Sequence, residues 1–169
     1  MAKKERPSAR EGSHLLVVGA VLFVVAWFVP VVAGEGMFNG LATDPYWQQQ
    51  FPNQTDVSAP DWLPGLTACK VAWSMLTHES LGSTDWRSRV MGATCLTNAV
   101  MLVSLLLLAV GSPRRPVGLL LLGCAALDAS WLYLTDSRSI ESYRAGYYLW
   151  LASFALVGAG ALPGRGAKR

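Results

Sequence analysis

The chain has 169 residues, of which 52% are apolar and only 15% are charged, and its formal net charge is +3 at pH 7. Soluble globular domains usually carry about 25% charged residues, and the charges here cluster at the ends and between long uncharged stretches. This distribution excludes an ordinary soluble domain and predicts an all-α polytopic membrane protein.

The first uncharged stretch follows a basic N-terminal segment, residues 1–13, and predicts a transmembrane helix over residues 14–34. A helix rises about 1.5 Å per residue, so this stretch is long enough to cross a hydrocarbon core of roughly 30 Å. Pro30 should end or kink the helix. Cleavage as a signal peptide is the alternative, although the apolar region of such peptides is typically about 7 to 15 residues.

Residues 35–89 form the predicted first extracytoplasmic loop, which is far longer than the links of about two to eight residues usual between packed helices. Within it, apolar residues recur at helical spacing and predict a short amphipathic helix over about 64–78. We expect Leu66, Trp73 and Leu76 to point inward. This face caps the bundle or rests at the membrane interface, or else it forms a docking surface for a partner or a lipid-like ligand.

Three further uncharged stretches complete a predicted four-transmembrane-helix bundle. Each span must satisfy its own backbone hydrogen bonds in lipid, which requires helix. The small residues on the last two spans favour close packing within the chain and leave the oligomeric state open. The predicted segments are the spans 90–112, 116–135 and 145–163, the cytoplasmic turn 113–115, the outer loop 136–144 and the cytoplasmic tail 164–169.

The orientation of the predicted bundle follows from its basic residues. Nine of the 14 lysines and arginines lie in the N-terminal segment, the 113–115 turn and the tail, whereas the two other loops hold the remaining five together with eight acidic residues. The positive-inside rule therefore places both termini in the cytoplasm. Every Trp and Tyr falls in the outer loops or in the outer halves of the spans, which agrees with this orientation.

Asp128 is the acidic residue within the predicted third span. A carboxylate in lipid is costly, so Asp128 should face the bundle interior, find a polar partner or take up a proton. We expect a polar cluster in which Asn98 and Thr97 are the candidate partners of Asp128, with a hydrogen bond to Asn98 preferred, and in which Ser130 extends the polar patch. Three roles remain open for this cluster, namely a structural hydrogen-bond pin, a proton- or ion-linked site, and an interface with another membrane subunit.

The cysteines do not suggest redox chemistry, because Cys69 is alone in the long loop while Cys95 and Cys124 lie on separate spans. Disulfide exchange needs paired thiols, commonly as C-x-x-C. The chain has no Gly-rich phosphate loop and no G-x-S-x-G elbow, and its two histidines lie on opposite sides of the predicted membrane. We therefore predict no catalytic residue, no metal ligand and no cofactor. Nucleic acid is not an expected partner, since the basic ends are short and follow from topology.

Three short motifs carry a resemblance. Leu63-Pro64-Gly65-Leu66, Leu96-Thr97-Asn98 and the segment GYYLWLAS over residues 146–153 resemble a loose group of small, uncharacterised four-span bacterial membrane proteins. In that group the loop motif often reads LPGW and the last span opens with GYYLW, so Leu66 departs from the pattern. The resemblance implies the four-span topology and location in a bacterial inner membrane, and it implies no activity.

The sequence therefore predicts a non-enzymatic membrane protein, either an accessory subunit or an envelope component. Its expected contacts are the lipid bilayer and another membrane or extracytoplasmic protein. The alternatives are a small proton- or ion-linked transporter or channel that uses Asp128, and an unrecognised membrane enzyme. The residues predicted to form the outer docking surface are Leu66, Trp73, Leu76, Tyr147, Tyr148 and Trp150.

Overall fold

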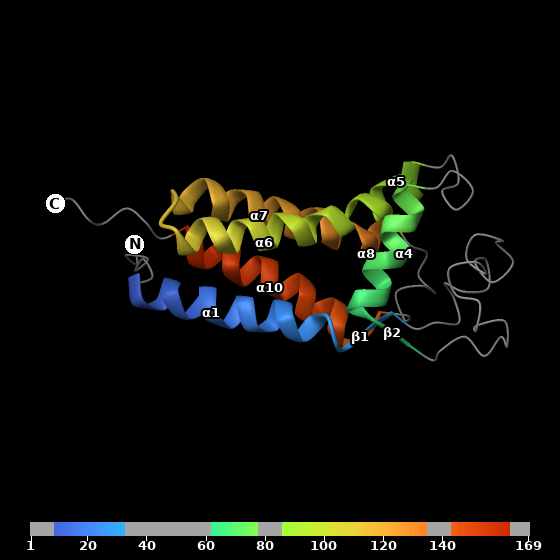
Figure 1. Ribbon diagram of the computed structural model, residues 1–169, viewed down its shortest axis with the longest axis horizontal. Helices are drawn as coiled ribbons and strands as arrows, with labels where there is room; N and C mark the ends of the chain where they lie inside the picture. The colour runs from blue at the N-terminus through green and yellow to red at the C-terminus, as the bar shows by residue number, and fades with distance from the viewer. Residues whose placement is uncertain (1–8, 33–61, 78–85, 135–142, 163–169) are drawn as a thin grey trace, which may run out of the picture.

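The computed structural model describes residues 9–32, 62–77, 86–134 and 143–162 (Figure 1). Most of these residues are helical, which confirms an all-α protein at this coarse level. Several predicted segments lie mostly outside the described residues. They are the N-terminal segment, the C-terminal tail and both outer loops. The long helices that run side by side are α1 (Ala9–Ala26), α6 (Cys95–Ala109), α7 (Arg114–Ala129) and α10 (Ala145–Ala161).

One helical stretch of the described chain, Arg114–Tyr133, is long and apolar enough to cross a bilayer, judged by length and composition. It comprises α7 and most of the short helix α8 (Trp131–Leu134). Gly12–Ala26, Cys95–Ala109 and Ala145–Ala161 are apolar but shorter.

The first helix ends before the proline that the sequence singled out. Helix α1 stops at Ala26, and the chain turns through hydrogen bonds from Trp27 N to Val24 O (3.2 Å) and from Phe28 N to Val25 O (3.0 Å). Pro30 then begins a strand, which accounts for a helix that is shorter than the predicted span to residue 34.

A small two-stranded sheet, which the all-α prediction did not include, follows that turn. Strand β1 (Pro30–Val32) pairs antiparallel with β2 (Leu63–Pro64), and Val32 also forms a bridge with Tyr143 just before α10. The sheet thus joins the end of α1, the start of α4 and the start of α10.

Helix α10 lies at the centre of the bundle and packs against both α1 and α7. Its approach to α7 depends on two glycines. A Cβ atom added to Gly118 would lie 2.8 Å from Gly158 O, and one added to Gly158 would lie 3.1 Å from Gly118 O. The absence of side chains at these two positions allows the two backbones to meet.

Two shorter helices occupy one end of the bundle, α4 (Gly65–Thr77) and α5 (Trp86–Ala93). Helix α5 leads into α6 through Thr94, and α4 lies across the bundle end in Figure 1. The two short helices approach closely at Gly92, where an added Cβ would lie 3.0 Å from Leu76 N and 3.1 Å from Ala72 O.

The predicted inward face of α4 is wrong with respect to the bundle. Leu66 is 49% exposed and Trp73 is 52% exposed, while Leu76 is half-buried. The buried residue is instead Ala72, which lies beside Gly92 of α5. The close approach of the two helices at Gly92 favours the small side chain of Ala72 between them, whereas Leu66 and Trp73 are exposed.

Candidate functional site

The candidate site lies at the α4 end of the bundle, and its innermost part is a polar cluster around Asp128. Asp128 is in the last turn of α7 and is 0% exposed. Its Oδ1 lies 3.2 Å from Thr97 Oγ1 of α6, and its backbone carbonyl accepts a hydrogen bond of 2.8 Å from the Tyr147 hydroxyl of α10. Residues from three helices, α6, α7 and α10, therefore meet at Asp128.

The Thr97 hydroxyl has two neighbours that can accept its proton. It donates to the Thr94 carbonyl, and it also contacts Asp128 Oδ1. A hydroxyl carries one proton, so both contacts are satisfied together when a neutral Asp128 carboxyl donates to Thr97. The second oxygen of Asp128, Oδ2, has no hydrogen-bond partner within the described part of the chain.

Asn98 belongs to a second hydrogen-bonded group. Its Oδ1 accepts a bond of 2.9 Å from Trp150 Nε1 of α10, and its Nδ2 lies 3.7 Å from Cys69 Sγ of α4, to which it donates. The side chain is 9% exposed, and these contacts connect α6, α10 and α4.

Of the two predicted partners of Asp128, Thr97 contacts its carboxyl, whereas the preferred partner, Asn98, bonds elsewhere. Consecutive residues of an α-helix point about 100° apart, because a turn contains about 3.6 residues. Thr97 consequently faces Asp128 on α7, while Asn98 faces α10 and α4. The Ser130 hydroxyl donates to the Leu127 carbonyl of its own helix at 2.6 Å, and this bond does not connect it to either group.

The predicted outer docking residues divide into an exposed set and an interior set. Tyr148 is 48% exposed, and Leu66 and Trp73 are exposed to a similar degree. Tyr147 is only 1% exposed, and Trp150 is half-buried and bonded to Asn98. The prediction that Tyr147 and Trp150 serve as docking residues is thus corrected, because both contribute to the interior of the bundle.

Tyr147 is the centre of the aromatic packing at this end. Its ring stacks on Tyr143 with centroids 4.4 Å apart and planes inclined by 21°. Trp150 lies 6.2 Å from it, and Trp131 lies 6.3 Å from Tyr143. The sequence identified these aromatics only as a membrane-interface belt, whereas in the fold they fill the space between α10, β1 and α8.

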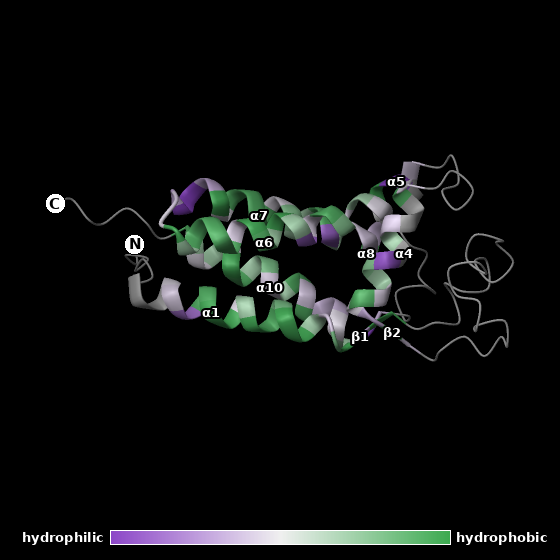
Figure 2. Cartoon of the chain, in the orientation of Figure 1, coloured by the Kyte–Doolittle hydropathy of each residue, from purple (hydrophilic) through white to green (hydrophobic). Residues whose placement is uncertain are grey.

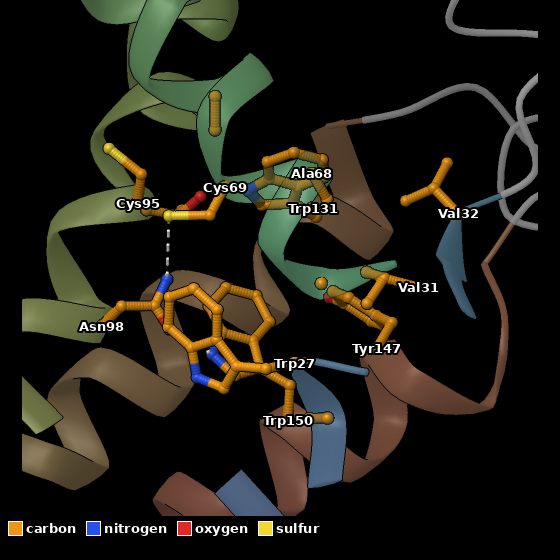
Figure 3. Close-up of a pocket in the computed structure, with 14 residues that line it drawn as sticks. Trp27, Val31, Val32, Ala68, Cys69, Cys95, Asn98, Trp131, Tyr147 and Trp150 are labelled. Carbon is orange, nitrogen blue, oxygen red and sulfur yellow. Dashed lines mark hydrogen bonds between the residues drawn. The ribbon is translucent and has the colours of Figure 1, made fainter. Parts of the chain in front are cut away.

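A cavity of about 50 Å³ lies between α4 and the bundle (Figure 3). Its wall is largely apolar and includes the aromatic residues Trp27, Tyr147 and Trp150, while Cys69, Cys95 and Asn98 supply polar atoms. This volume is sufficient for water or for a small apolar group.

Sequence reasoning missed the proximity of two thiols. It placed Cys69 in the loop and Cys95 in a span, yet both line this cavity. Burial raises the pKa of the Cys69 thiol, and the hydrogen bond from Asn98 partly offsets this effect. The sequence signal that bears on this site is the spacing of Cys95 and Asn98. They are three residues apart and share a helix face, which places Cys95 near the residue that bonds to Cys69.

The geometry thus combines a buried carboxyl, a bonded asparagine and a small cavity with a largely apolar wall. These groups can hold a proton at Asp128 and bind a small molecule or a neighbouring side chain. Comparisons with models of known families, with curated proteins and with solved structures find no match to this chain.

Proposed function

We propose that this protein is a four-span, non-enzymatic component of a bacterial inner membrane that presents exposed aromatic residues at its α4 end to a protein partner. The observation that carries the proposal is the reversed polarity of the bundle. Many large apolar side chains are exposed, while several polar side chains are buried. Figure 2 shows that hydrophobic residues occupy most of the length of the long helices.

The flanks of the bundle expose large aliphatic side chains on each long helix that packs around α10. Val21 of α1 is 56% exposed, Leu106 of α6 is 68% exposed and Leu120 of α7 is 54% exposed. Ser104 and Ser153 are at most 2% exposed. Water disfavours exposed apolar area by about 25 cal/mol per Å². Soluble monomers rarely expose contiguous apolar patches above a few hundred Å², so this arrangement favours lipid as the surrounding solvent.

The helix lengths are compatible with membrane spans. Helices α1 and α10 contain 18 and 17 residues. At about 1.5 Å per residue each is about 26 Å long, close to the roughly 30 Å hydrocarbon core. Helix α5 precedes α6 and is joined to it through Thr94. The apolar segment Cys95–Ala109 is therefore only part of a longer helical stretch.

We define the outer aromatic surface as the exposed Trp and Tyr residues at or near the α4 end. Trp and Tyr are favoured both at the membrane interface and at protein interfaces, because each combines an apolar ring with a polar atom. This dual preference supports an outer face that rests on the bilayer and contacts another protein. Its members are Trp62, Trp73, Trp86, Tyr133 and Tyr148.

The topology is tested by single cysteines introduced at Ser8, Asn53, Ser112 and Ser139 in a variant that lacks the three native cysteines. We expect a membrane-impermeant maleimide added to intact cells to label only the Asn53 and Ser139 positions, because the basic segments stay in the cytoplasm. All four positions should react after the membrane is permeabilised. Labelling of the Ser112 position in intact cells would contradict the orientation.

The partner is tested by a photoreactive amino acid placed at Trp73, with Val103 as the matched control. Both side chains are about half exposed, at 52% and 54%, but Val103 lies on an apolar flank of α6. Irradiation of cells should give a discrete protein adduct from position 73 and only lipid adducts from position 103. If positions 73, 86 and 148 all yield only lipid adducts, the outer aromatic surface is a membrane anchor and the partner proposal fails.

A second candidate function is supported by Asp128. Its carboxyl is completely buried between α7 and α6, and Oδ2 has no hydrogen-bond partner among the residues that the structure describes. Acidic groups within membrane spans commonly belong to proton or ion pathways. A small proton- or ion-linked transporter would use this carboxyl. This candidate function predicts a pH-dependent flux of protons or ions through the reconstituted protein.

A further inference from the structure

We propose that Cys69 and Cys95 form a disulfide that ties α4 to α6 at the outer end of the bundle. The proposal rests on the orientation given under the proposed function, which places this end in an oxidising compartment. The sequence did not suggest the pair, because 25 residues separate the two cysteines and neither belongs to a C-x-x-C motif.

The two thiols face the same small space from different helices. Cys69 of α4 and Cys95 at the start of α6 both line the cavity. Figure 3 shows both sulfur atoms on the same side of the cavity, above Asn98. Asn98 donates to Cys69 Sγ at 3.7 Å and lies about one helical turn after Cys95, which brings α4 and α6 together at this position.

The unequal burial of the pair sets the order of reaction. Cys95 is 7% exposed, whereas Cys69 is half-buried, so an external disulfide reaches Cys69 first. Asn98 donates a hydrogen bond to the Cys69 sulfur and stabilises its thiolate. Burial nevertheless raises the pKa of this thiol, so the thiolate is scarce at neutral pH and its first attack is slow.

The reaction needs a disulfide donor, such as oxidised glutathione or a protein disulfide. The Cys69 thiolate attacks one donor sulfur, which breaks the donor S–S bond, forms a mixed disulfide and releases one donor thiol. Cys95 then loses its proton and attacks Cys69 Sγ, which releases the second donor thiol. Two protein thiols are oxidised, and one donor disulfide is reduced to two thiols.

The third cysteine provides an internal reference. Cys124 lies on α7, is 9% exposed and does not belong to the residues that line the cavity. Denaturation exposes every thiol, so the number of maleimide adducts per chain reports directly how many cysteines are unpaired.

The test is maleimide counting by intact mass on the full-length protein, denatured without reductant. Protein purified from the membrane of cells under non-reducing conditions should carry one adduct, at Cys124, and three adducts after reduction. Cys69→Ser and Cys95→Ser should each carry two adducts before and after reduction. Cys124→Ser should carry none before reduction and two afterwards. The disulfide should also raise the thermal unfolding temperature, and reduction should abolish this rise.

A second arm separates the geometry from the orientation. Reduced, folded protein in detergent is incubated with oxidised glutathione before it is denatured and counted. The protein could carry one adduct after this incubation but three when it is taken directly from cells. This result would support the thiol geometry and contradict an oxidising location for this end of the bundle. Three adducts in both samples, or a lasting glutathione adduct without loss of a second thiol, would overturn the pair.

Discussion

Replacing Tyr147 with alanine is expected to lower the free energy of unfolding by about 3 to 5 kcal/mol, the range typical of large aromatic truncations in cores. The side chain is 1% exposed, stacks on Tyr143 and donates its hydroxyl to the Asp128 carbonyl. Its loss leaves a cavity where α10 meets β1 and α7. Unfolding by heat or denaturant in mild detergent measures the effect.

The neighbouring tyrosine supplies a matched control for this change. Tyr148 is 48% exposed, so Tyr148→Ala should change the stability by only about 0.5 kcal/mol. Tyr147→Phe keeps the ring and removes only the hydroxyl bond to the Asp128 carbonyl, at a cost of about 1 kcal/mol. Equal losses for Tyr147→Ala and Tyr148→Ala would show that the interior position of Tyr147 is incorrect.

Asp128→Leu is expected to cost about 1 to 3 kcal/mol, because it removes the contact with Thr97 and places methyl groups against a buried polar atom. Asp128→Asn should retain most of the stability, since an amide has similar size and can donate to Thr97 Oγ1. Ser130→Ala is the control, because the Ser130 hydroxyl bonds within its own helix. A loss as large for Ser130→Ala as for Asp128→Leu would contradict this description of the polar cluster.

The same variants decide between a structural and an ion-linked role for Asp128. If the carboxyl carries protons, wild-type protein in liposomes should give a flux that depends on pH and exceeds that of empty liposomes. Asp128→Asn should then fold normally and lose this flux, because an amide cannot titrate. Wild-type liposomes without flux across the pH range would remove the transport candidate and leave Asp128 as a hydrogen-bonding group between α7 and α6.

Local signals in the sequence predicted most of the stretches that form helices. These signals act locally, through backbone hydrogen bonding and the fixed φ of proline. They are the long uncharged runs, the prolines near the ends of these runs, and the spacing of three to four residues between apolar positions in the outer loop. Helix α1 accordingly stops four residues before Pro30, and α4 (Gly65–Thr77) lies within one residue at each end of the predicted 64–78. The four-span membrane topology was also predicted from the sequence, and cysteine labelling is its direct test.

Which side chains meet depends on the tertiary structure. Helical periodicity indicates that residues share a face, but it does not specify which neighbour covers that face. Thr97 and Asn98 are adjacent in sequence and bond to different helices, because about 100° of rotation separates them. The inward face of α4 likewise depends on the close approach of this helix to Gly92. Ala72 is buried at this contact, and Trp73 is exposed. Close packing between helices depends on distances that arise only when all of them are assembled.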